Sequence, residues 1–268
     1  MNKETQLPAI IYKYRNFENP EERRMLTDNE IYLASPDEFI KKGSIDCDFE
    51  IKYPKISHTE LINFYIASYQ ALPTEETIKN AIKYANNPPY YNNSNRLSAE
   101  RILKKKINES LGIFCVSDTW NNIELWKKPF GGDGKGFCVG FNSEKLVEYL
   151  KFKDYDKLDY YNKTEKPILT FDPYNKYSRE EVHKFIMSLP VNFHKENEYR
   201  LYKQSINNES LLRKYILPNE IISEVIFGEL FDVNKNMEII VQLKTKGIKV
   251  FQAKFDFTLN DLCKIKIH

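Results

Sequence analysis

The sequence predicts an α+β fold, in which a mixed and mostly antiparallel β-sheet core carries a helical insertion. The 268 residues are 41% hydrophobic and 29% charged, a balance typical of globular proteins with a substantial core. Segments of strand length and segments of helical spacing both occur, without the strict alternation of a doubly wound fold. One largely helical stretch, 56–109, lies between strand-rich flanks. We therefore expect a single α+β domain over 1–268, with 56–109 as an insertion or subdomain.

The individual elements follow from local signals along the chain. Asn19 is a suitable N-cap, and Pro20 suits the first position of a helix. Ser178 and Glu181 form a capping box at the start of another helix. An Asn- and Pro-rich stretch, 84–96, breaks the helical insertion. In chain order we expect strands at 9–15, 30–34, 113–116, 136–141, 196–201, 224–227 and 248–255, and helices at 20–27, from 58, from 74, and at 98–109, 143–150, 178–189 and 234–243.

Composition argues against several classes of function. Lys and Arg (40) nearly balance Asp and Glu (38), so the net charge of +2 gives no global signal for nucleic acid. The basic run 101–106 is either a local patch or a solvated helix face. No apolar stretch has the length of a membrane span, and we expect no membrane association. Four scattered cysteines and four histidines without metal-ligand spacing predict no metal cofactor and a reducing cytoplasm.

The most informative stretch is 196–201, which alternates polar and apolar residues like a half-buried strand. This alternation places Glu196, Glu198 and Arg200 on one face, and Tyr199 and Leu201 on the other. Two carboxylates and a guanidinium are costly to bury unless they serve each other or a ligand. The face is therefore a candidate site.

The first strand offers possible partners for this face. Lys13 and Arg15 share one side of it, whereas Tyr12 and Tyr14 share the other. Two neighbouring cations repel each other unless an anion or carboxylates lie near. The pair either forms a salt-bridge cluster with Glu196 and Glu198 or binds a phosphate or pyrophosphate, and the sequence leaves both possibilities open.

Hydroxyl side chains follow the strand at 113–116. Ser117 and Thr119 lie either in a helix N-cap region or against a ligand ribose. Trp120 or Trp126 could then offer a flat stacking face. The glycine-rich loop 130–136 lacks the spacing of a P-loop or of a dinucleotide fingerprint. It is either a flexible connection or a loop whose backbone approaches a ligand.

A metal-dependent nuclease is a further alternative. Asp46, Asp48 and Glu50 alternate in the sequence and could gather a divalent ion. Acidic loops are usually solvated, however.

A series of short motifs resembles a bacterial family of domains of unknown function, some of which are encoded near phage-defence genes. The resemblance spans most of the chain outside the insertion and has two departures, at 40–50 and at 127–130, where the family has an Asn-Asp-Pro-Phe turn and a His-Tyr pair. The motifs are Tyr-Lys-Tyr-Arg at 12–15, Ser-Pro-Asp-Glu-Phe at 35–39, Gly-Ile-Phe-Cys-Val-Ser at 112–117, Leu-Trp at 125–126, Gly-Phe-Cys-Val-Gly-Phe at 136–141 and Glu-Asn-Glu-Tyr-Arg at 196–200.

The order of three of these polar groups is also similar to the arginine–serine–glutamate pattern of mono-ADP-ribosyltransferases. That resemblance implies a split sheet that clasps NAD as substrate. Arg15 would hold the pyrophosphate, with Lys13 and Tyr14 beside it. Ser117 and Thr119 would support the nicotinamide ribose, and Trp126 would stack on the ligand. Glu198 would stabilise the oxocarbenium-like transition state, and Glu196 would orient an acceptor.

The sequence thus favours an NAD-consuming ADP-ribosyltransferase-like enzyme or glycohydrolase, acting as a bacterial toxin or anti-phage defence effector. The acceptor would be a protein or a nucleic acid, and an antitoxin or other protein would be a partner. The alternatives are a non-catalytic binding or sensor module, in which the charged face is a structural network, and the metal-dependent nuclease.

Overall fold

A large mixed sheet forms the centre of the protein. The computed structural model describes residues 6–41, 47, 49–53, 55–68, 73–88, 93–162, 166–170, 179–204 and 213–268. Eight strands follow the order β14-β13-β12-β5-β1-β4-β10-β6, and all neighbours are antiparallel except β12 and β13. The predicted α+β class with a mostly antiparallel mixed sheet is confirmed. These strands are β1 (Ile10–Arg15), β4 (Leu111–Ser117), β5 (Phe137–Asn142), β6 (Asp154–Lys157), β10 (Glu198–Gln204), β12 (Ile222–Phe227), β13 (Lys249–Asp256) and β14 (Asp261–Lys266).

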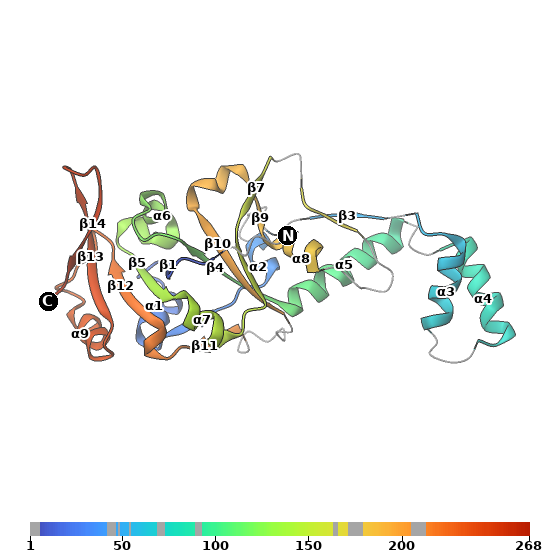
Figure 1. The fold of residues 1–268 in the computed structure, drawn as a ribbon, viewed down its shortest axis with the longest axis horizontal. Helices are drawn as coiled ribbons and strands as arrows, with labels where there is room; N and C mark the ends of the chain where they lie inside the picture. Colours follow the sequence, from blue (N-terminus) through green and yellow to red (C-terminus); the bar gives the residue numbers. More distant parts are fainter. Residues whose placement is uncertain are drawn as a thin grey trace.

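Three short strand pairs and a set of helices surround the sheet (Figure 1). The pairs are β2 (Glu30–Tyr32) with β11 (Lys214–Ile216), β3 (Glu50–Lys52) with β8 (Ile168–Thr170), and β7 (Asp159–Tyr161) with β9 (Ser188–Pro190). The helices are α1 (Pro20–Thr27), α2 (Pro36–Lys41), α3 (His58–Ser68), α4 (Glu75–Asn86), α5 (Asn93–Ser110), α6 (Ile123–Lys127), α7 (Ser143–Leu150), α8 (Arg179–Ile186) and α9 (Met237–Thr245), with 3-10 segments η2 (Pro129–Gly134), η3 (Val191–Glu196) and η5 (Asn219–Ile221).

The two faces of the sheet pack into different hydrophobic clusters, as the period of two along each strand requires. On β1, Ile11 packs into the largest cluster, whereas Tyr12 and Tyr14 pack into another with α6. On β4, Phe114 joins the largest cluster and Ile113 a third. Hydrophobic clusters thus cover both faces of the sheet around β1, β4 and β10, and most residues of β4 and β10 are buried.

Several predicted elements need correction. The predicted helix at 98–109 begins earlier, at Asn93, and the capping residue Ser178 lies outside the described residues. The strand predicted to be last, at 248–255, is followed by β14. The Asp261–Lys266 strand gave little signal because its burial is only partial on both faces.

The helical insertion lies mostly away from the sheet. In Figure 1, α3 and α4 lie at the far end of α5, where Leu61 and Ala85 form a small core of their own. Within the insertion, α5 contacts the sheet through β4. The expectation that the insertion covers part of the sheet holds for α5. Its description as part of one domain stays a prediction.

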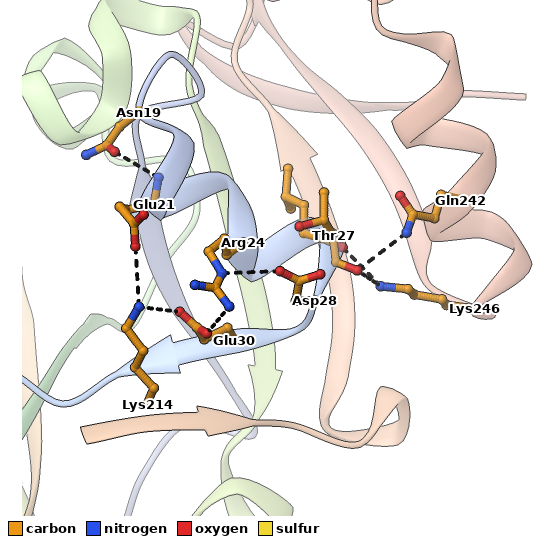
Figure 2. A network of polar contacts seen from close by, with 10 residues as sticks. Asn19, Glu21, Arg24, Thr27, Asp28, Glu30, Lys214, Gln242 and Lys246 are labelled. Carbon is orange, nitrogen blue, oxygen red and sulfur yellow. Dashed lines mark hydrogen bonds and ion pairs between the residues drawn. The ribbon is translucent and has the colours of Figure 1, made fainter. Parts of the chain in front are cut away.

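Helix α1 is fixed at both ends by polar contacts (Figure 2). Asn19 caps its first turn, as the sequence predicts, by accepting a hydrogen bond from the Glu21 backbone N–H. At the other end, Lys246, which follows α9, donates to the carbonyl of Thr27. In between, Arg24 pairs with the buried Glu30 of β2. These contacts hold α1 against its neighbours, and α1 carries the cavity-lining residue Glu22.

Candidate functional site

The sheet is split between strands β1 and β4. Within β1 and β4, both fully described, Tyr12 and Ser117 form the single paired position. Further along β4, Ile113 pairs with Ala34, with backbone hydrogen bonds of 2.8 and 2.9 Å in the two directions. Between these two pairings the carbonyl of Cys115 accepts a hydrogen bond from Lys13 Nζ at 2.5 Å. A side-chain ammonium therefore occupies the place where a neighbouring strand would donate.

A cavity of about 340 Å³ opens at this split. Arg15 of β1, Ser117 of β4 and Glu198 of β10 all line it. Tyr12, Ser117 and Glu198 also lie in one row across the sheet, because each is the cross-strand partner of the next. The full lining comprises Tyr12, Lys13, Tyr14, Arg15, Glu22, Phe39, Cys115, Val116, Ser117, Leu125, Lys128, Phe130, Leu189, Phe193, Glu196 and Glu198.

Glu198 is held by a buried partner on its own strand. Its Oε1 accepts from Arg200 Nε at 2.7 Å, and the Arg200 side chain has no exposed surface. The two side chains share a face, as the alternation predicts, and Tyr199 and Leu201 pack into the cluster on the opposite face. The prediction of a half-buried strand is wrong, because 198–202 are buried on both faces.

Glu196 does not belong to this strand. It ends the 3-10 segment η3, and Asn197, with a φ of 47°, turns the chain before β10 begins. The prediction that Glu196 continues the face of Glu198 is therefore wrong, although both side chains line the cavity. The break follows from the left-handed conformation, which asparagine tolerates better than most residues.

The predicted salt-bridge cluster between the two strands does not form among the described residues. Glu198 pairs with Arg200, and Glu196 pairs with Lys128 at 3.6 Å. Neither carboxylate lies within ion-pair distance of Lys13 or Arg15. Lys13, Arg15, Glu196 and Glu198 instead line one cavity, together with Glu22 and Lys128.

The two cations of β1 are desolvated by the cavity walls. Burial, together with the neighbouring guanidinium of Arg15, lowers the pKa of Lys13 to about 8. Burial also lowers the pKa of Arg15, which stays a cation at any ordinary pH; the charge of Glu22 acts in the opposite direction. The one side-chain hydrogen bond of Arg15 among the described residues reaches the carbonyl of Tyr14 at 3.5 Å. Its guanidinium can therefore take up an anion.

Ser117 and Thr119 have local hydrogen bonds. Ser117 Oγ donates to the carbonyl of Glu196 at 3.4 Å and accepts from the Thr119 backbone N–H at 3.3 Å. The hydroxyl of Thr119 is bonded to Asn121, and Thr119 is not among the residues that line the cavity. Of the two hydroxyls, only Ser117 has the position that ribose binding would need.

The aromatic side of the cavity differs from the prediction. Trp126 is only 5% exposed, its Nε1 donates to the Trp120 carbonyl, and its ring packs edge-on against Tyr14. It offers no open stacking face, so this role needs correction. Three partly exposed phenylalanines on α2, η2 and η3 line the cavity instead. They are Phe39, Phe130 and Phe193. Phe39 belongs to the motif at 35–39 and Phe130 to the loop 130–136, but no sequence signal gave any of the three a ligand-binding role, because their elements are far apart in the chain.

The glycine-rich loop packs closely against the protein's own backbone. A Cβ on Gly136 would lie 2.4 Å from the Arg15 carbonyl oxygen, and one on Gly228 would lie 2.2 Å from the Gly134 oxygen. Gly228 in turn donates its backbone N–H to the Gly136 carbonyl at 2.9 Å. The loop is therefore neither a flexible connection nor a ligand cradle, but a close-packed support for the end of β1.

Two of the three residues of the nuclease alternative lie outside the part of the chain that the structure describes. Asp46 and Asp48 lie outside the described residues, and Glu50 is an exposed residue of β3. Among the described residues, no group of three or more His, Cys, Asp or Glu side chains could hold a metal ion. In the same part of the chain, no helix is both long and apolar enough to cross a membrane.

Comparisons of the chain with protein-family models, with curated proteins and with solved structures found no match. The two family resemblances therefore rest on the sequence motifs alone, and the geometry of the cleft is the observation that bears on function.

Proposed function

We propose that the cleft binds NAD and cleaves its nicotinamide–ribose bond, transferring ADP-ribose to an acceptor or to water. The observation that supports this proposal is that Arg15, Ser117 and Glu198, from three strands, line one cavity at a split in the sheet. These side chains are far apart in the sequence, and a chance motif match would not require them to meet.

Each side chain has a role that its chemistry allows. The guanidinium of Arg15, with the Lys13 ammonium beside it, suits the pyrophosphate. Ser117 suits a ribose hydroxyl. As the C–N bond breaks, nicotinamide departs with the bonding electrons and positive charge develops on the ribose. The Glu198 carboxylate would stabilise that charge until a nucleophile adds to the ribose carbon.

The size and the walls of the cavity suit part of a dinucleotide. About 340 Å³ lies near the lower end of the range for small-molecule pockets, roughly 300–1,000 Å³. The nicotinamide riboside half would enter, with Phe39, Phe130 or Phe193 against its planar ring. We further propose that the protein acts in the cytoplasm as a toxin or defence effector. Its acceptor would be a protein or nucleic acid, and an antitoxin its partner.

Incubation of the purified protein with NAD should release nicotinamide, measured by chromatography. Replacing Arg15 by methionine should raise KM for NAD by about 10- to 100-fold, because a charge-assisted hydrogen bond contributes roughly 1.5–3 kcal/mol. Arg23→Met is the matched control, since Arg23 lies on α1 and is absent from the cavity lining. Absence of nicotinamide release by wild type with protein, DNA and RNA acceptors would refute the proposal.

Anion binding in the cleft should weaken as the pH rises from 7 to 9. The pKa of Lys13 is about 8, so its ammonium is mostly charged at pH 7 and mostly neutral at pH 9. The affinity for ADP-ribose, measured by calorimetry, should fall about tenfold over this range. Lys13→Met should bind weakly at pH 7 and show little further change. If the affinity of Lys13→Met for ADP-ribose fell with pH as steeply as that of wild type, a group other than Lys13 would cause the pH dependence.

A binding or sensor module is the second candidate, favoured by the buried Glu198–Arg200 pair. That pair has the features of a structural network. If it is purely structural, Glu198→Gln should lower the free energy of unfolding while ligand binding and product formation per folded molecule stay unchanged. Thermal unfolding and NAD turnover of the same samples separate the two functions.

A further inference from the structure

We infer that Arg200 is a positioning residue that fixes the Glu198 carboxylate, so that one oxygen faces the ligand. This inference rests on the proposed function. Arg200 itself does not line the cavity and would not touch substrate. It lies two residues beyond Glu198 on β10, on the same face of the strand.

The guanidinium joins the carboxylate to a rigid part of the fold. Arg200 Nε donates to Glu198 Oε1 at 2.7 Å, and Nη1 donates to the Ile186 carbonyl at 2.7 Å. Ile186 is the last residue of α8 and has no exposed surface. Because the guanidinium is planar, fixing Nη1 at the carbonyl also fixes the direction in which Nε meets the carboxylate.

The two carboxylate oxygens of Glu198 differ in their surroundings. Oε1 is taken by Arg200, whereas no hydrogen bond from a described residue reaches Oε2. The side chain is 11% exposed and contributes to the cavity lining. With Oε1 held, Oε2 is the oxygen left to accept a hydrogen bond from a ribose hydroxyl and to face the developing positive charge.

Arg200 also supports a second wall of the cleft. Its guanidinium carbon lies 5.5 Å from the centre of the Phe39 ring, which lines the cavity from α2. A fully buried guanidinium is costly, and well-packed apolar residues often stabilise a core equally well. Arg200 contacts two residues of the cavity lining, Glu198 and Phe39, despite the cost of burying its guanidinium. A role in the site explains its presence better than a contribution to stability does.

Two variants and one control test the inference. Arg200→Met removes the charge and the hydrogen bonds to Glu198, to the Ile186 carbonyl and to Cys47 Sγ. Arg200→Lys keeps the charge but cannot bridge Glu198 and the Ile186 carbonyl with fixed geometry. If Arg200 positions Glu198, kcat for nicotinamide release should fall by about 100-fold in Arg200→Met and less in Arg200→Lys, with KM within about twofold of wild type. Arg213→Lys, which changes another buried guanidinium bonded to backbone carbonyls but absent from the cavity lining, is the matched control. It should leave kcat within a few-fold.

A readout independent of turnover separates this inference from the proposed function. In protein labelled with ¹³C at glutamate carboxyl carbons, Glu198→Gln assigns the Glu198 signal. That signal should shift or broaden in Arg200→Lys and stay unchanged in Arg213→Lys. If wild type releases no nicotinamide, the proposed function fails, and the signal still tests the positioning. A Glu198 signal unchanged in Arg200→Lys, or equal loss of kcat and folded fraction, would overturn the inference. If Arg200→Met does not fold, Arg200→Lys supplies both readouts.

Discussion

Replacing Glu198 by glutamine is expected to slow nicotinamide release from NAD by about 100- to 1,000-fold, the usual effect of losing one electrostatic stabiliser of a transition state. Glutamine has nearly the same shape, but it carries no charge to offset the positive ribose. The affinity for ADP-ribose should stay within a few-fold, because the charge matters mainly as the bond breaks. Single-turnover kinetics with the folded variant and calorimetry with ADP-ribose measure the two quantities separately.

Two controls define what this result means. Glu196→Gln should retain hydrolysis of NAD but transfer less ADP-ribose to an acceptor, because Glu196 lies at the cavity on a different element, η3. Glu144→Gln, on the exposed side of α7, should change neither activity. Equal rates of nicotinamide release by wild type and Glu198→Gln would mean that the Glu198 carboxylate has only a structural role.

Replacing Gly136 by alanine is expected to destabilise the protein by about 3 kcal/mol, or roughly 6–12 °C in Tm. The added Cβ would lie 2.4 Å from the Arg15 carbonyl oxygen and 2.5 Å from that of Gly131. Both are backbone atoms, so neither can rotate away. Because Arg15 is the last residue of β1, the shift should also displace its guanidinium and raise KM for NAD. Thermal unfolding and steady-state kinetics of one variant test both effects.

Gly247→Ala provides the matched control. Gly247 has a φ of 78°, yet nothing lies within 4 Å of the position of its Cβ. The only cost is the left-handed conformation, about 1 kcal/mol, and the cleft is not affected. Similar losses of Tm in the two variants would mean that the contact with Arg15 does not limit stability.

Local signals predicted much of the fold. Asn19 caps α1, and the alternation in β1 separates Ile11 from Tyr12 and Tyr14, both as the sequence indicates. Helix capping and strand alternation depend on a few residues that are neighbours in the sequence, so local patterns predict them. The meeting of Arg15, Ser117 and Glu198 was predicted only through a family resemblance, since pairing between strands depends on contacts across the whole chain.

Three features of the candidate site were not predicted, and each has an identifiable physical reason. The alternation at 196–201 continues through Asn197, and nothing in the pattern showed that this residue turns the chain. Trp126 suggested a stacking platform, but its neighbour Tyr14 covers it. The sequence offered Glu198 partners on its own strand and on β1, and Arg200 on its own strand pairs with it. Alternation gives the face of a side chain and not the partner that it selects.

Backbone pairings of β4 on either side of Cys115 fix the width of the opening between the strands. Tyr12 meets Ser117 at one end and Ala34 meets Ile113 at the other, so the opening along β4 spans four residues, about 13 Å. Widening it would break backbone pairing inside a covered sheet. A ligand would therefore enter a preformed slot, and its association should show a single kinetic phase without a slow opening step. The slot would also select by length, admitting a nucleoside end-on and leaving a longer molecule partly outside.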